Sequence, residues 1–161
     1  MSDFDEKIIE RLKRLEREVE RLQVKEQPVG AWASYAVSWT AVTTNPSIGY
    51  GTLAGRYVQM GKTIICVVSL TMGGTTTYGS GSWSFSLPKR AKSAGVRYLG
   101  TWNAYDAGAD KSYAGNCEIW AGAAAIGAFS RDLSTGWLNS TTPFTWGSGD
   151  ELRFQVIYEA A

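Results

Sequence analysis

The sequence of 161 residues contains no histidine and only two cysteines. Histidine is the commonest general base and a common metal ligand, so its absence excludes Ser-His-Asp and Cys-His catalytic sets. A phosphate-binding loop and a dinucleotide-binding glycine motif are missing as well. The acids Asp106 and Asp110 flank a short loop that could offer oxygens to calcium, but two acids without a third favour a solvated turn. The sequence therefore predicts a protein that is not an enzyme and that holds neither a metal nor a cofactor.

Long apolar runs and a strong net charge are also missing. No run reaches the roughly 18 apolar residues of a membrane span, and the charged start of the chain does not resemble a signal peptide. The net charge is +1, with no basic block after the first 30 residues, which argues against binding nucleic acid or a membrane surface through charge. Synthesis in a cytoplasm is the resulting expectation. Cys66 and Cys117 lie in strand-like runs and are predicted to be buried free thiols, with a disulfide between them as the alternative.

Charge is concentrated at the start of the chain, where residues 1–30 hold 8 acids and 7 bases. The apolar residues between these charges are spaced alternately by 4 and 3, which is the pattern of a coiled-coil seam. Such a narrow stripe on a helix is buried only against other copies of the helix. Residues 1–27 are therefore predicted to form a coiled-coil stalk, followed by a linker over residues 28–31.

A short signature within this stalk favours three strands. Arg11 at heptad position g and Glu16 at position e surround Leu12 and Leu15, and together they match the trimerisation signature Arg-h-x-x-h-Glu, where h is hydrophobic. An arginine at g can reach a glutamate at e of the neighbouring helix and cover the seam with its methylenes. The sequence predicts a homotrimer; a dimer, a higher oligomer or a single helix folded back on the rest of the chain are the alternatives. The predicted trimerisation residues are Ile8, Arg11, Leu12, Leu15, Glu16, Val19 and Leu22.

The stalk is short, and this has a consequence for the rest of the chain. About three heptads form a helix that is marginal by itself in water. Residues 32–161 are therefore expected to add contacts between the copies.

Residues 32–161 have the pattern of a β-structure. Trp83, Phe85 and Leu87 alternate with serines, and the segment 152–158 alternates apolar and polar residues in the same way. This period of two is typical of half-buried strands. Turn-rich segments separate the strands, and no fixed repeat is present. About eight strands in a domain of this size predict a mainly β head with an antiparallel, jelly-roll-like β-sandwich.

Seven tryptophans are the second unusual feature of the head. Aromatic rings fill cores and interfaces and also stack on sugar rings. Trp83 and Trp102 lie in the apolar phase of their strands and are predicted to be core residues, whereas Trp120 lies in the opposite phase and faces a subunit boundary or solvent. If the head binds a glycan, the expected ligand-binding residues are the aromatic and polar side chains near turns. They are Trp137, Tyr105, Tyr78, Asp106, Asn103 and Asn139, for each of which the alternative is a side chain that only covers its neighbour.

Three stretches resemble tail-fibre and minor tail proteins of phages that infect Gram-positive bacteria, notably actinobacteria. The first stretch runs from Trp39 to Tyr57 and contains the segments Thr-Asn-Pro-Ser-Ile-Gly and Gly-Thr-Leu-Ala-Gly-Arg-Tyr. The others run from Gly79 to Pro88 and from Trp146 to Leu152. The similarity extends through most of residues 32–158. It implies a virion-associated β head that recognises a host surface or decorates the particle, and it carries no catalytic set.

The combined prediction is a virion structural protein, made in the host cytoplasm, that forms a trimeric tail fibre or tail-tip head and binds a saccharide on the host cell surface. Its expected partners are other copies of itself, other virion proteins and a host glycan, but neither nucleic acid nor a membrane. The alternative is a capsid fibre or decoration protein, or a tail connector, without a receptor-binding role.

Overall fold

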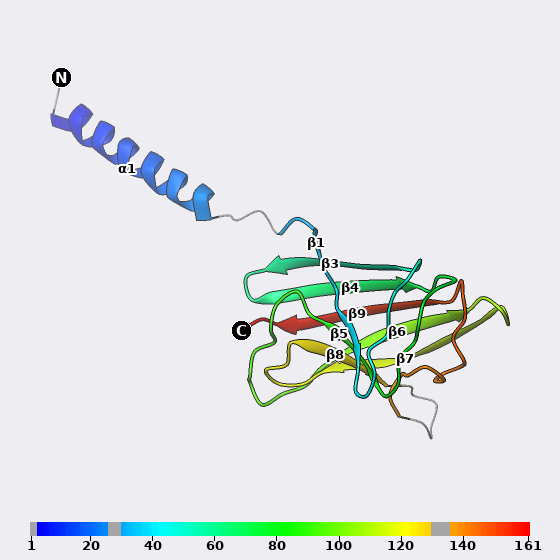
Figure 1. Cartoon of the computed structure of the whole chain (residues 1–161). Coiled ribbons are helices and arrows are strands. Elements are labelled where there is room, and N and C mark those ends of the chain that lie inside the picture. Colours follow the sequence, from blue (N-terminus) through cyan, green and yellow to red (C-terminus); the bar gives the residue numbers. More distant parts are fainter. Residues whose placement is uncertain (1–2, 26–29, 130–135) are drawn as a thin grey trace. The chain divides into compact units, whose positions relative to one another are not determined.

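The computed structural model describes residues 3–25, 30–129 and 136–161, which belong to two compact units, Met1–Ala31 and Trp32–Ala161 (Figure 1). The first unit contains one helix, α1 (Asp3–Lys25). Acidic residues in its first turn, Asp5 and Glu6 among them, favour the positive end of the helix dipole. Among the residues described, no helix is apolar over a length that would cross a membrane.

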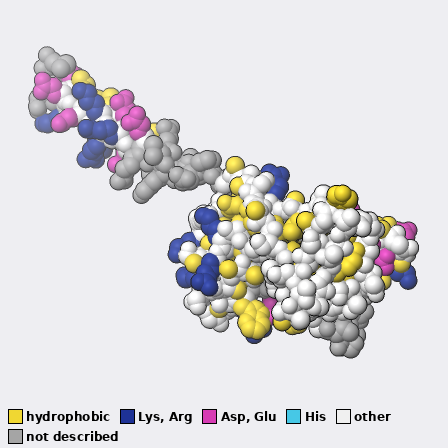
Figure 2. Space-filling model, viewed as in Figure 1, with side chains coloured by type: hydrophobic (Ala, Val, Ile, Leu, Met, Phe, Trp, Pro, Cys, Tyr) yellow, Lys and Arg dark blue, Asp and Glu magenta, His cyan; other side chains and the backbone are white. Residues whose placement is uncertain are grey.

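The apolar seam of α1 is exposed in the single chain. Ile8, Leu12, Leu15 and Val19 all remain accessible to solvent, while the other faces of the helix carry closely spaced charges (Figure 2). The side chain of Leu22, which is predicted to continue the seam, lies outside the described residues. An isolated helix of this length is marginal in water. Burial of its exposed apolar stripe against other helices would therefore stabilise α1.

The described residues of the second unit form a mainly β structure. Its nine antiparallel strands make one curled sheet in the order β1-β3-β4-β9-β6-β7-β8-β5-β2, and Figure 1 shows the long strands β3, β4 and β9 side by side. The strands are β1 (Ala33–Tyr35), β2 (Trp39–Ala41), β3 (Thr52–Met60), β4 (Thr63–Thr71), β5 (Trp83–Ser86), β6 (Tyr98–Asp106), β7 (Lys111–Ile119), β8 (Ala125–Phe129) and β9 (Glu151–Glu159).

Alternation along the strands gives the sheet two different faces. In β9, Leu152 and Phe154 are buried and Arg153 between them is exposed. The register with β4 preserves this division, because Leu152 pairs with Leu70 and Phe154 pairs with Val68. We call the side that carries these buried residues the inner face and the opposite side the outer face. A slip of one residue would exchange the two faces.

The inner face packs against itself because the sheet curls. The ring centroids of Phe85 in β5 and Phe154 in β9 lie 4.7 Å apart, although three strands separate β5 from β9 in the sheet order. Trp83 is completely buried, with its ring centroid 4.8 Å from that of Trp39 and 5.2 Å from that of Trp146. Trp102 is also buried, so the prediction that Trp83 and Trp102 are core residues is confirmed. These large rings supply much of the apolar area that stabilises the head.

Both cysteines are buried on the inner face and are free thiols. The prediction of buried free thiols is therefore confirmed. Burial raises the pKa of the Cys66 thiol, and it raises the pKa of Cys117 to about 12. Because the thiolate is the reactive form, both groups are protected by their position and by their protonation.

We expect the two thiols of the folded chain to be unreactive toward Ellman's reagent at about pH 8, near the ordinary pKa of a cysteine. Unfolding in guanidinium chloride should expose both thiols for each chain. The absorbance of the released dye gives the count. Fast reaction of either thiol in the folded protein would contradict the described burial, and no reaction after unfolding would indicate a disulfide.

Candidate functional site

The head has a low density of charge, and its outer face carries the hollows in which a ligand could bind. Residues 31–161 contain only 7 acids and 9 bases. In the view of Figure 2, charged side chains are correspondingly sparse over much of the head. Recognition by this surface must therefore depend on aromatic, polar and a few well-placed charged groups.

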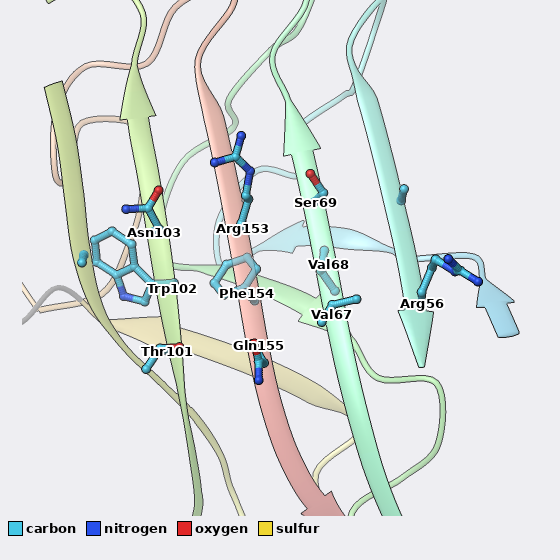
Figure 3. A pocket seen from close by; sticks show the side chains of 12 residues that line it. Arg56, Val67, Val68, Ser69, Thr101, Trp102, Asn103, Arg153, Phe154 and Gln155 are labelled. Atoms are coloured by element: carbon cyan, nitrogen blue, oxygen red, sulfur yellow. The ribbon is translucent and has the colours of Figure 1, made fainter. Parts of the chain in front are cut away.

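One hollow of about 610 Å³, which we call the arginine groove, crosses strands β3, β4, β9, β6 and β7. Its floor is made of small or polar side chains from one register of the sheet. In this register Ala54 pairs with Ser69, and Asn103 pairs with Ala114. Arg153 of β9 completes this register between Ser69 and Asn103. The same face carries Arg56, Val67, Gln155 and Thr101 at the next register (Figure 3).

The donors in the arginine groove are already partly engaged within the head. The guanidinium carbon of Arg56 lies 5.8 Å from the centroid of the Trp32 ring. Arg153 forms an ion pair with Glu151 on its own strand, and the Asn103 amide donates a hydrogen bond to a main-chain carbonyl of β7 at 3.1 Å. The groove can offer guanidinium and amide hydrogens to a polar ligand, but it has no exposed aromatic face for stacking among its lining residues.

Another hollow of about 370 Å³, which we call the tryptophan hollow, lies over strands β5 and β8. Trp120 and Trp137 line it together with Ser84 and Gly127. Gly127 allows this arrangement, since a Cβ atom at that position would lie 2.7 Å from a ring carbon of Trp137. The flat ring of Trp137 therefore lies directly on the backbone of β8.

Trp120 is exposed but held in place. It is 52 % accessible to solvent, and its Nε1–H donates a hydrogen bond to Oε1 of Glu118 at 2.7 Å. Glu118 is only 7 % exposed, and Nη1 of Arg97 donates to its two carboxylate oxygens at 3.2 and 3.3 Å. The guanidinium carbon of Arg97 also lies 4.6 Å from the centroid of the Trp120 ring. An exposed ring that is fixed by a charge-assisted hydrogen bond and a cation–π contact can stack on a ligand with little loss of side-chain entropy.

The structure divides the six predicted glycan-binding residues between several places. Asn103 and Tyr105 lie on the outer face of β6, and Asn103 belongs to the arginine groove. The Tyr105 hydroxyl donates to Asp110 at 2.8 Å, and this hydrogen bond raises the pKa of Tyr105. Asp106 accepts a hydrogen bond from the main-chain N–H of Ala109 at 2.9 Å, which closes the turn after β6.

The remaining three residues lie elsewhere. Asn139 donates its amide hydrogen to the main-chain carbonyl of Trp137 at 3.2 Å, so these two residues form one local unit beside the tryptophan hollow. Tyr78 packs against the core, and its carbonyl accepts the Nε1–H of Trp83 at 3.0 Å. Of the six, only Trp137 lines the tryptophan hollow and only Asn103 lines the arginine groove.

Sequence reasoning missed the group formed by Arg97, Glu118 and Trp120. The sequence contains part of the evidence for this group. Residues two apart in a strand lie on the same face, so Glu118 and Trp120 are expected to be neighbours. The contribution of Arg97 depends on the pairing of β6 with β7, in which Leu99 lies opposite Glu118. In the described part of the chain, no cluster of three or more cysteine, aspartate or glutamate side chains is placed to hold a metal.

Comparison with known proteins relates the chain to phage tails. It is 29 % identical over 127 residues to the "Mu-like prophage FluMu defective tail fiber protein" of Haemophilus influenzae, a match that covers 79 % of this chain and 20 % of that protein. The chain thus spans about a fifth of the length of this curated relative. No family model and no solved structure matches the chain. The similarity supports a distant relationship to phage tail fibre proteins, while the actinobacterial type of phage stays a prediction.

Replacing Glu118 by alanine should lower the free energy of unfolding by about 1–3 kcal/mol, because a charged acceptor shared by Trp120 and Arg97 is lost. The matched control is Glu151→Ala, which removes a more exposed ion pair with Arg153 and should cost no more than about 1 kcal/mol. Urea unfolding of the full chain at one fixed protein concentration measures both values. Equal losses for the two variants would show that Glu118 does not hold Trp120.

Proposed function

We propose that this chain is a virion structural protein that forms the head and stalk of a phage tail fibre or tail tip and binds the host cell surface through a saccharide. The similarity to a tail fibre protein over 127 residues is the observation that carries the proposal. It favours a place on the tail over a capsid decoration. In this account the chain is made in the host cytoplasm, joins other virion proteins, and has no catalytic, metal-binding or cofactor-binding role.

The proposal includes a homotrimer joined through α1. The seam residues Ile8, Leu12, Leu15 and Val19 are exposed in the single chain, and three parallel helices would bury them as a continuous core. Arg11 and Glu16 flank this seam at positions that suit ion pairs between helices. The jelly-roll-like sandwich also stays part of the proposal, supported by the packing of Phe85 on Phe154 across the curled sheet.

We assign the saccharide to the tryptophan hollow. Sugar rings present apolar C–H faces that stack on flat aromatic rings, and their hydroxyl groups need hydrogen-bond partners. The hollow combines the rings of Trp120 and Trp137 with the hydroxyl groups of Ser82 and Ser84. Three such sites on one trimer would give avidity to contacts that are weak individually.

The stalk proposal predicts a particle of three times the chain mass of 17.5 kDa. The variant Leu15→Asp places a charge in the seam and should give monomers, because a buried unpaired carboxylate opposes assembly. Lys13→Asp, on the charged face of the same helix, is the matched control and should remain trimeric. Native mass measurement over a dilution series separates these results, and a monomeric wild-type chain would contradict the stalk.

The saccharide proposal predicts that fluorescently labelled full chain binds cells of the phage's host and that soluble envelope glycan competes with this binding. Trp120→Ala and Trp137→Ala should each weaken binding about tenfold or more, as truncation of a central aromatic contact usually does. Tyr50→Ala removes a ring that is 87 % exposed and serves as the control with unchanged binding. If the trimeric wild-type chain leaves host cells unlabelled, the adhesin role is wrong.

A further inference from the structure

A row of apolar side chains crosses the outer face between the two hollows. Val58 of β3 pairs with Ile65 of β4, and Ile65 pairs with Ile157 of β9. Leu99 of β6 follows in the same row, because the next residue, Gly100, pairs with Val156. We call these four residues the apolar row. Leu99 is 66 % exposed and Ile157 is 51 % exposed, whereas Ile65 is half-buried and Val58 is already buried. The solvent-facing part of the row therefore lies on β4, β9 and β6.

We infer that the apolar row is the surface through which the heads of joined copies touch one another, so that its partner is a second copy of this chain. This inference rests on the stalk part of the proposed function and adds the location of the contact between heads. Contiguous apolar groups on a soluble surface mark an interaction site more often than scattered single ones do. Continuity across the three neighbouring strands β4, β9 and β6 distinguishes the accessible part of this row from isolated exposed residues.

The surroundings of the row favour a protein partner over a sugar. The neighbouring side chains Val67, Gln155 and Thr101 are uncharged. Charged groups border the row at its ends and on its other side: Arg56 on β3, the ion pair of Lys92 with Glu159, and the ion pair of Arg97 with Glu118. An apolar centre with a polar rim is the usual anatomy of a protein–protein interface.

The charges around the row and the stalk both favour a copy of the same chain as the partner. The rim carries both signs of charge, so copies arranged around a threefold axis can pair opposite charges. The exposed seam of α1 independently calls for other copies. Seven residues separate Lys25, the last residue of α1, from Ala33, the first residue of β1, and such a chain spans at most about 30 Å. Heads tethered this closely have a high effective concentration for one another, so a modest apolar contact suffices.

The contact would place the tryptophan hollow at its margin. Leu99, the last residue of the row, pairs with Glu118, which holds Trp120. Binding between copies and binding to the host then use adjacent parts of one face and can be measured separately.

The test uses the full chain with a new cysteine in the row, because the native thiols are buried. Leu99→Cys and Ile157→Cys report on the row, and Tyr50→Cys is the matched control at a position that is 87 % exposed. Each variant is labelled with a maleimide that carries polyethylene glycol, with the intact stalk and with Leu15→Asp in the stalk. Native mass measurement accompanies each sample.

In the assembled protein we expect the cysteines of the row to label about tenfold more slowly than Cys at position 50, a ratio that corresponds to about 1.4 kcal/mol of contact. In the monomeric stalk variant, the row and the control should label at equal rates. Equal rates in a trimer would overturn the inference and leave the stalk proposal intact. A wild-type monomer would overturn both, and slow labelling in the monomer would show that the chain itself covers the row.

Discussion

The register between strands β4 and β9 is the constraint on which the rest of the head depends. It keeps Leu70 with Leu152 and Val68 with Phe154 on the inner face. The pair between them, Ser69 and Arg153, therefore points outward. Curling of the sheet then brings β5 against β9 through Phe85 and buries most of that face. Because side chains alternate strictly along a strand, the same register that fills the core also decides what the outer face displays. The arginine groove and the apolar row follow from it.

The outer face combines two kinds of surface that suit a fibre head. The tryptophan hollow offers rings fixed by local contacts, among them the hydrogen bond from Trp120 to the buried carboxylate of Glu118. The apolar row offers apolar surface, and burying it in a contact between copies is favourable without requiring precise bond directions. In the proposed assembly, a stalk that gathers copies would align several binding sites and bring the rows within reach of one another.

Local patterns in the sequence predict much of this fold. Alternation identifies the strands around Trp83 and Phe154 and places Trp83 and Trp102 in the core, because a half-buried strand must separate apolar from polar residues. Non-local features are different. The contact of Arg97 with Glu118, and the alignment of Ile65 with Ile157, depend on which strands become neighbours. Sequence spacing alone does not contain that information, so the candidate site was predicted only through single residues such as Trp137 and Asn103.

The most direct test of the central claim, that the chain is a tail component which meets the host, is its location on the particle. An antibody against the chain can be bound to intact phage particles and imaged with gold by electron microscopy. The account predicts label at the distal end of the tail, at positions that disappear when the host envelope covers the tail tip. Label distributed over the capsid would contradict the account, and the tryptophan hollow would then no longer be a candidate receptor site.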